Sequence, residues 1–140
     1  AKTVTFWGQA NQSVTMTWND LSAECVQPDP VVETRPSTSA PSIPAGMKCA
    51  CMVDQQSTAI NPNCPVIVYK GKTFWAFSYI DNRMSMGIVA YDASGKVCTT
   101  WEKPGARYVY KITVDNTAKT VTFWGQANQS VTMTWAELSM

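Results

Sequence analysis

Three stretches of this sequence place an aromatic ring beside side-chain amides or charges. Residues 7–12 read WGQANQ, the same six letters return at residues 124–129, and residues 79–83 read YIDNR. Proteins bind sugars with such sets, because the apolar C–H face of a sugar lies on an aromatic ring while amide and carboxylate groups bond its hydroxyls. Packing in the core or in turns is the alternative role for these residues. The candidate ligand-binding residues are Trp124, Gln126, Asn128, Asp81, Asn82, Arg83, Trp7, Gln9 and Asn11.

The residue types that most enzyme mechanisms need are missing. The sequence has no histidine, which removes the usual general base, the Ser-His and Cys-His nucleophiles and the commonest transition-metal ligand. A carboxylate pair of the kind that glycosidases use is the remaining option. However, Asp54, Asp92 and Asp115 have turn-like neighbours, and Glu102 has no partner near it in sequence. No glycine-rich phosphate loop occurs, so we predict that the chain is not an enzyme and needs no cofactor.

The other reactive groups are five cysteines, Cys25, Cys49, Cys51, Cys64 and Cys98. Two disulfides and one free thiol are the simplest oxidised arrangement, and five reduced thiols in a cytosolic protein are the alternative. Cys49 and Cys51 are expected to pair with different partners, because a bridge between them would close a very small ring. The C-x-C spacing lacks the paired C-x-x-C of structural zinc sites, so we predict no metal site.

The charge balance limits the partners that the chain can attract. Charged residues make up 15% of the 140 residues, and the formal net charge is +1. This balance produces no long-range field for nucleic acid or for an anionic membrane surface. No stretch approaches the roughly 20 apolar residues of a membrane-spanning helix. We therefore expect neither nucleic acid nor a membrane as a partner.

A long exact repeat lies at the two ends of the sequence. Residues 2–18 and 119–135 both read KTVTFWGQANQSVTMTW. Within each copy, two segments of alternating polar and apolar residues flank the turn-forming residues GQANQ, and this pattern predicts a β-hairpin. Diverged structural repeats share a pattern rather than every residue. The chain is therefore either one period of a tandem array or the product of a recent or engineered duplication.

The sequence between the two copies divides into a proline-rich part and a β-rich part. Residues 27–46 contain five of the eight prolines, which predicts a semi-extended linker, with an ordered surface loop as the alternative. Beyond it, strands are predicted at residues 65–69, 73–80, 84–91, 96–101 and 107–114, with turns about every 10 residues. We therefore predict an all-β fold, either an antiparallel sandwich or barrel or a propeller-like meander, with a duplicated terminal hairpin. The expected units are a hairpin at 1–22, a linker at 23–46 and a β domain at 47–140.

Two functional hypotheses follow from these features. The first is a secreted, non-catalytic recognition module of a lectin-like kind that binds a glycan through the residues named above. The second is a structural subunit of a tandem array or fibre, in which another copy of the chain is the partner and the duplicated hairpin undergoes strand exchange. Two identical hairpins would then compete for one site and produce a homo-oligomer. The alternative is a pseudo-symmetric fold with a separate site for each hairpin.

Overall fold

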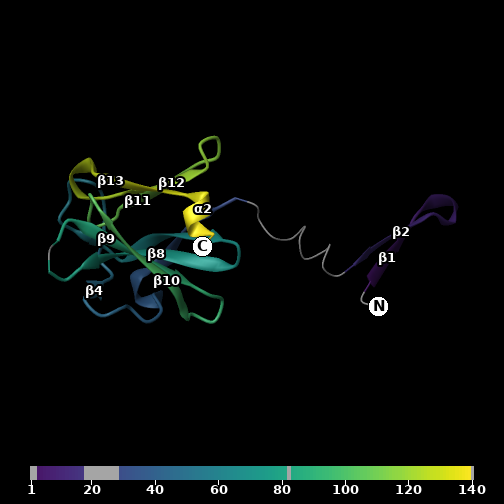
Figure 1. Cartoon of the computed structure of the whole chain (residues 1–140), viewed down its shortest axis with the longest axis horizontal. Coiled ribbons are helices and arrows are strands. Elements are labelled where there is room, and N and C mark those ends of the chain that lie inside the picture. The colour runs from purple at the N-terminus through teal and green to yellow at the C-terminus, as the bar shows by residue number, and fades with distance from the viewer. Residues whose placement is uncertain (1–2, 18–28, 82, 140) are drawn as a thin grey trace.

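The computed structural model describes residues 3–17, 29–81 and 83–139 (Figure 1). The described residues form antiparallel strands and one short α-helix, so the predicted all-β class is confirmed. The larger sheet has the strand order β10-β9-β8-β7-β3, with β4 paired to β8. Its strands are β3 (Val31–Pro36), β4 (Met47–Lys48), β7 (Asn63–Tyr69), β8 (Lys72–Tyr79), β9 (Ser85–Tyr91) and β10 (Val97–Pro104).

The central strands of this sheet are buried on both faces. Every residue of β9 is buried, and so are the last six residues of β8. Strands of this kind carry near-continuous apolar sequence instead of alternation. The segment that follows β3 contributes to this burial, because Tyr91 donates a 2.8 Å hydrogen bond to the carbonyl of Ser42. Gly87 on β9 is close to the side chain of Met47, so that a Cβ at Gly87 would lie 2.6 Å from it.

A second sheet of three strands follows the larger one in sequence and shares its core. The apolar residues Val121, Phe123, Val131 and Met133 of this sheet belong to the same buried cluster as Phe74 of β8. A short helix follows the last strand of this sheet, and a capping box between Thr134 and Glu137 stabilises its first turn. The strands of this sheet are β11 (Lys111–Asp115), β12 (Thr120–Trp124) and β13 (Ser130–Thr134), in that order, and the helix is α2 (Trp135–Leu138). Two short strands, β5 (Cys51–Met52) and β6 (Ile60–Asn61), pair as a separate sheet.

The structure differs from the sequence prediction at three places. Residues 31–36, which we predicted to be linker, form β3, which pairs with β7 along the edge of the larger sheet. Prolines are compatible with an edge strand because its outer N–H groups need no partner. Strand 107–114 begins only at Lys111, since Tyr108 adopts φ 57° and interrupts extended geometry. Strand 96–101 continues to Pro104, also on an edge. No sheet among the described residues closes on itself, so the predicted barrel and propeller alternatives are not confirmed.

The first described residues form a separate hairpin with the same local structure as residues 120–134. Strands β1 (Thr3–Trp7) and β2 (Ser13–Thr17) pair in the register that β12 and β13 use, shifted by 117 residues. Ala10 and Ala127 occupy the same left-handed conformation in the turn, with φ 61° and 58°. Figure 1 shows this N-terminal hairpin (residues 3–17) apart from the two sheets, whereas the C-terminal hairpin (residues 120–134) lies within one of them.

The two hairpins differ in burial although their sequences agree. Phe123 is 0% exposed and Val131 is 7% exposed, but the equivalent Phe6 and Val14 are 52% and 64% exposed. Burying a side chain of this size contributes about 1.5–3 kcal/mol. The difference therefore comes from what each hairpin packs against and not from its own residues.

Substitution of one buried and one exposed phenylalanine tests this description. Phe74→Ala is expected to lower the free energy of unfolding by roughly 3–5 kcal/mol, because it leaves a cavity in the core. Phe6→Ala is expected to change it by less than about 0.5 kcal/mol, because Phe6 has little packing to lose. Urea denaturation of the two variants beside the unaltered protein measures both values. A loss at Phe6 as large as the loss at Phe74 would mean that the N-terminal hairpin is packed.

Candidate functional site: a hairpin and the site that binds it

The C-terminal hairpin occupies a defined site on the rest of the chain. Strand β11 pairs with the outer edge of β12 over five residues, from Lys111 opposite Trp124 to Asp115 opposite Thr120. Two backbone bonds fix the turn of the hairpin, one from Gln126 N–H to the Arg107 carbonyl at 2.8 Å and one from Ala127 N–H to the Gln55 carbonyl at 2.8 Å. We call β11, Gln55, Met86, Ala106 and Arg107 the hairpin-binding site.

Gly125 shows how closely the hairpin fits this site. A Cβ at Gly125 would lie 2.5 Å from the Arg107 carbonyl oxygen, 3.0 Å from Met86 and 3.2 Å from Ala106. The equivalent Gly8 has the same backbone conformation, but a Cβ there would meet only its own hairpin, at 3.7 Å from the Gln12 carbonyl oxygen. The requirement for glycine therefore comes from the hairpin-binding site and not from the turn.

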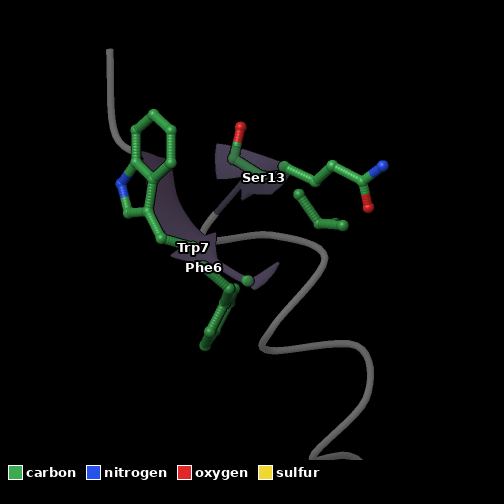
Figure 2. Close-up of a pocket in the computed structure, with 6 residues that line it drawn as sticks. Phe6, Trp7 and Ser13 are labelled. Atoms are coloured by element: carbon green, nitrogen blue, oxygen red, sulfur yellow. The ribbon is translucent and has the colours of Figure 1, made fainter. Parts of the chain in front are cut away.

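Trp124 on β12 contacts side chains of the neighbouring edge strand β11. Its indole N–H donates to the Thr113 hydroxyl at 3.0 Å, and the Lys111 ammonium lies 5.1 Å from the ring centroid. The equivalent Trp7 is 73% exposed. Trp7 and Phe6 point to opposite sides of the N-terminal hairpin (Figure 2). Together with Gly8, Gln12, Ser13 and Val14 they line a shallow open hollow.

The turn of the C-terminal hairpin lines a second hollow, which is rich in amides. Its lining residues are Gln55, Gln56, Gln126, Ala127 and Asn128. Two of the predicted ligand-binding residues, Gln126 and Asn128, therefore meet there, but Trp124 does not line this hollow. Sequence reasoning missed Gln55 and Gln56, because only the tertiary fold brings their loop to the hairpin. Gln9 and Asn11 are the exposed counterparts in the N-terminal hairpin.

The predicted residues Asp81 and Arg83 form an exposed ion-pair cluster. The Arg83 Nε group donates to both Asp81 carboxylate oxygens at 2.9 Å, and a terminal Arg83 nitrogen donates to Glu102. The Arg83 guanidinium also lies 4.3 Å from the ring centroid of Tyr79. These bonds occupy the groups that we expected to contact a ligand, and Glu102 is the partner that the sequence did not indicate. Asn82 lies outside the described residues.

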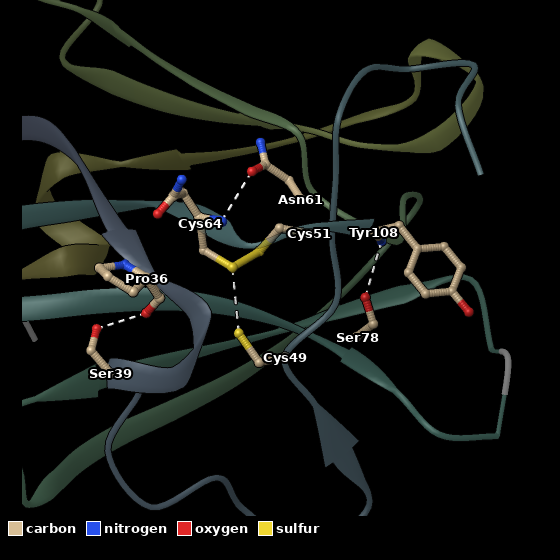
Figure 3. The surroundings of a disulfide bond; sticks show 9 residues. Pro36, Ser39, Cys49, Cys51, Asn61, Cys64, Ser78 and Tyr108 are labelled. Carbon is tan, nitrogen blue, oxygen red and sulfur yellow. Dashed lines mark hydrogen bonds between the residues drawn. A yellow bond between two sulfur atoms is a disulfide. The ribbon is translucent and has the colours of Figure 1, made fainter. Parts of the chain in front are cut away.

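Three of the five cysteines form one cluster (Figure 3). Cys51 and Cys64 form a disulfide, while Cys49 keeps a free thiol whose sulfur lies 3.4 Å from that of Cys64. All three sulfurs lie within 4.8 Å of one another, but two of them are bonded together and cannot hold a metal while the disulfide is present. Cys49 and Cys51 are not bonded to each other, as we expected, but Cys49 has no disulfide partner, and the described residues contain one disulfide instead of the two predicted. Cys98 is free and exposed, and Cys25 lies outside the described residues.

Replacing the cation of the ion-pair cluster tests its electrostatics. Hydrogen bonds from the Arg83 guanidinium hold the pKa of the Asp81 carboxyl below its ordinary value. A carboxyl group with a lowered folded-state pKa stabilises the fold above its unfolded pKa, and this stabilisation disappears as the pH falls through the folded pKa. Arg83→Gln is therefore expected to raise the Asp81 pKa and to reduce the loss of stability on acidification. A carbon-detected NMR titration in which Asp81 keeps its pKa would contradict this role for Arg83.

Comparison with protein-family models, curated proteins and solved structures found no match for this chain. No helix among residues 3–17, 29–81 and 83–139 is long and apolar enough to cross a membrane.

Proposed function

We propose that this chain is an assembly module in which the N-terminal hairpin can replace the C-terminal hairpin in the hairpin-binding site of another copy. The difference in exposure between Phe6 and Phe123, which have identical sequence surroundings, carries this proposal. Every side chain and backbone group that the C-terminal hairpin uses in the site has an identical counterpart in residues 3–17. The molecule would then be a subunit of a tandem array or fibre.

A link between two copies lasts only under certain conditions, because the described part of each chain has more hairpins than sites for them. The described residues contain two hairpins of this sequence and one hairpin-binding site. Exchange into an occupied site expels an identical hairpin, so the buried apolar area does not change and the entropy cost of association opposes the link. A lasting link therefore needs a site that its own C-terminal hairpin has left. Which hairpin occupies a site then depends on how each hairpin is connected to that site along the chain and on the protein concentration.

The disulfide supports an oxidising compartment. A Cys51–Cys64 disulfide persists in oxidising surroundings, and secreted proteins meet this condition. We therefore include a secreted, extracellular location in the proposal. Mass spectrometry of the protein from its natural source, with free thiols alkylated at harvest, would find this disulfide intact. Its absence there would favour a reducing compartment.

The two equivalent glycines provide a matched test of hairpin replacement. Gly125→Ala is expected to displace the C-terminal hairpin, because the added Cβ meets the Arg107 carbonyl oxygen. The N-terminal hairpin then occupies the site, so the free energy of unfolding falls little. Gly8→Ala alone should change it by less than about 0.5 kcal/mol. The double variant has no hairpin that fits and should lose roughly 1–3 kcal/mol more than the two single variants together.

Oligomeric state distinguishes replacement between chains from replacement within one chain. Light scattering coupled to size-exclusion chromatography of Gly125→Ala should show dimers or larger species that increase with concentration, and the double variant should show none of them. If the effects of the two substitutions on stability simply add, the N-terminal hairpin does not use the site. If Gly125→Ala keeps its stability as a monomer at every concentration, the assembly proposal is wrong.

A second candidate function is glycan recognition at the amide-rich hollow. The observation in its favour is that Gln55 and Gln56 lie beside Gln126 and Asn128, which concentrates amide donors and acceptors on one surface. Gln56→Ala removes one exposed amide and should weaken glycan-array binding by roughly tenfold if that amide bonds a sugar hydroxyl. Gln9→Ala is the control, because Gln9 is an exposed amide outside this hollow. Equal binding by both variants and the unaltered protein, or no binding at all, would exclude this hollow.

A further inference from the structure

The cysteine cluster contains a free thiol in contact with a disulfide, and the proposed function does not use it. The Cys49 sulfur lies 3.4 Å from the Cys64 sulfur, and only Ala50 separates Cys49 from Cys51 along the chain. Cys51 and Cys64 are 0% and 1% exposed, whereas Cys49 is half-buried. A reagent from solution thus reaches the bonded sulfurs less easily than Cys49 does.

We propose that Cys49 and Cys51 exchange places as the disulfide partner of Cys64. The Cys49 thiol loses its proton, and the thiolate sulfur attacks the Cys64 sulfur. A Cys49–Cys64 bond forms as the Cys51–Cys64 bond breaks, and the leaving electron pair stays on the Cys51 sulfur, which takes up a proton. One disulfide and one thiol are present before and after the step, so no external oxidant or reductant is required.

The geometry places the attacking sulfur correctly but not yet in line. All three sulfurs lie within 4.8 Å of one another, so they form a triangle, whereas attack requires them to approach a line. The Cys49 side chain must therefore turn before it reacts. Cys49 lies directly after the two-residue strand β4 and is half-buried. Cys98, the other free thiol described, is exposed and is not a member of the cluster.

Burial makes the exchange slow near neutral pH. Burial raises the pKa of the Cys49 thiol, which reduces the fraction of reactive thiolate. Among the described titratable groups, Tyr91 interacts with Cys49, and burial followed by this interaction raises the pKa of Tyr91 to about 12. Exchange should accelerate as the pH rises toward the Cys49 pKa.

Exchange would change how the chain supports the hairpin-binding site. In the form described, the disulfide joins β5 to β7, and Met52 of β5 donates to the Val109 carbonyl at 3.0 Å. The loop that begins after β5 carries Gln55, whose carbonyl accepts the bond from Ala127 in the hairpin turn. A Cys49–Cys64 bond moves the covalent link two residues toward β4 and leaves β5 held by hydrogen bonds alone. The two disulfide forms therefore differ in how firmly Gln55 is positioned.

Thiol mapping of the full chain tests the exchange. The protein is incubated at pH 8.5 with EDTA and without oxygen, quenched with acid to stop exchange, unfolded, labelled with maleimide and digested. We expect label on Cys49 in most chains and on Cys51 in a minor fraction, with Cys98 labelled throughout as an internal control. After the pH is raised from 4, labelling should approach this distribution at a rate that increases roughly tenfold with each added pH unit, up to the Cys49 pKa.

Two variants show which thiol is responsible. Cys49→Ser should reduce Cys51 labelling by roughly tenfold or more, because the attacking sulfur is absent. Cys51→Ser should form the Cys49–Cys64 disulfide. Cys51 labelling that persists in Cys49→Ser would show that another thiol opens the bond and would overturn the proposal. Unlabelled Cys51 in the unaltered protein after long incubation at pH 8.5 would also overturn it, whether or not the variants fold.

Discussion

A two-stranded hairpin cannot bury its apolar face or satisfy its outer edge by itself. Such a hairpin is marginally stable in water until a third strand or a packed surface completes it. In this molecule β11 provides the third strand for residues 120–134, and the shared core covers Val121, Phe123, Val131 and Met133. Residues 3–17 also require a third strand and a packed surface, but within the described structure they pair with no third strand, and Phe6, Trp7 and Val14 are exposed. The supply of third strands, and not the sequence of the hairpin, therefore determines which copy is buried.

Local features of the fold could be predicted from the sequence, and features set by distant contacts could not. The alternation around GQANQ specified both hairpins, because the turn and the strand register depend on residues within the hairpin. Strand β3 was missed because its prolines suggested a linker, and only pairing with β7 shows it to be an edge strand. The break at Tyr108 was missed because its positive φ accompanies a hydrogen bond to Ser78, which is far away in sequence.

The candidate site shows the same division between local and distant determinants. Gln126 and Asn128 were identified from their types and their position beside a turn, but Gln55 and Gln56 reach them only in the folded chain. Arg83 was expected to bind a ligand, yet the pairing of β9 with β10 places Glu102 within its reach and the ion pairs engage it. The free cysteine at position 49 could not be distinguished from Cys51 in sequence, since the choice depends on which sulfur faces Cys64.

The proposed exchange between residues 3–17 and residues 120–134 would follow a simple free-energy balance. A hairpin that enters an occupied site gains the same binding free energy that the expelled hairpin loses. Small changes in the affinity of either hairpin for the site therefore decide which one is bound. Gly125 and the Gln55 loop are two places where such a change can act, the first by steric fit and the second through the disulfide that supports β5. In this proposal, the disulfide that supports β5 would affect the occupancy of the hairpin-binding site, through which copies would join.

Pulsed hydrogen exchange with mass spectrometry measures this occupancy most directly. Because residues 2–18 and 119–135 are identical, their peptic fragments have the same mass and appear as one peptide. At low protein concentration, a short labelling pulse should split this peptide into two isotope envelopes of equal intensity, a protected one from the bound hairpin and a rapidly exchanging one from the free hairpin. A single envelope would show that both hairpins are bound or both are free, and would contradict the account of one site for two hairpins.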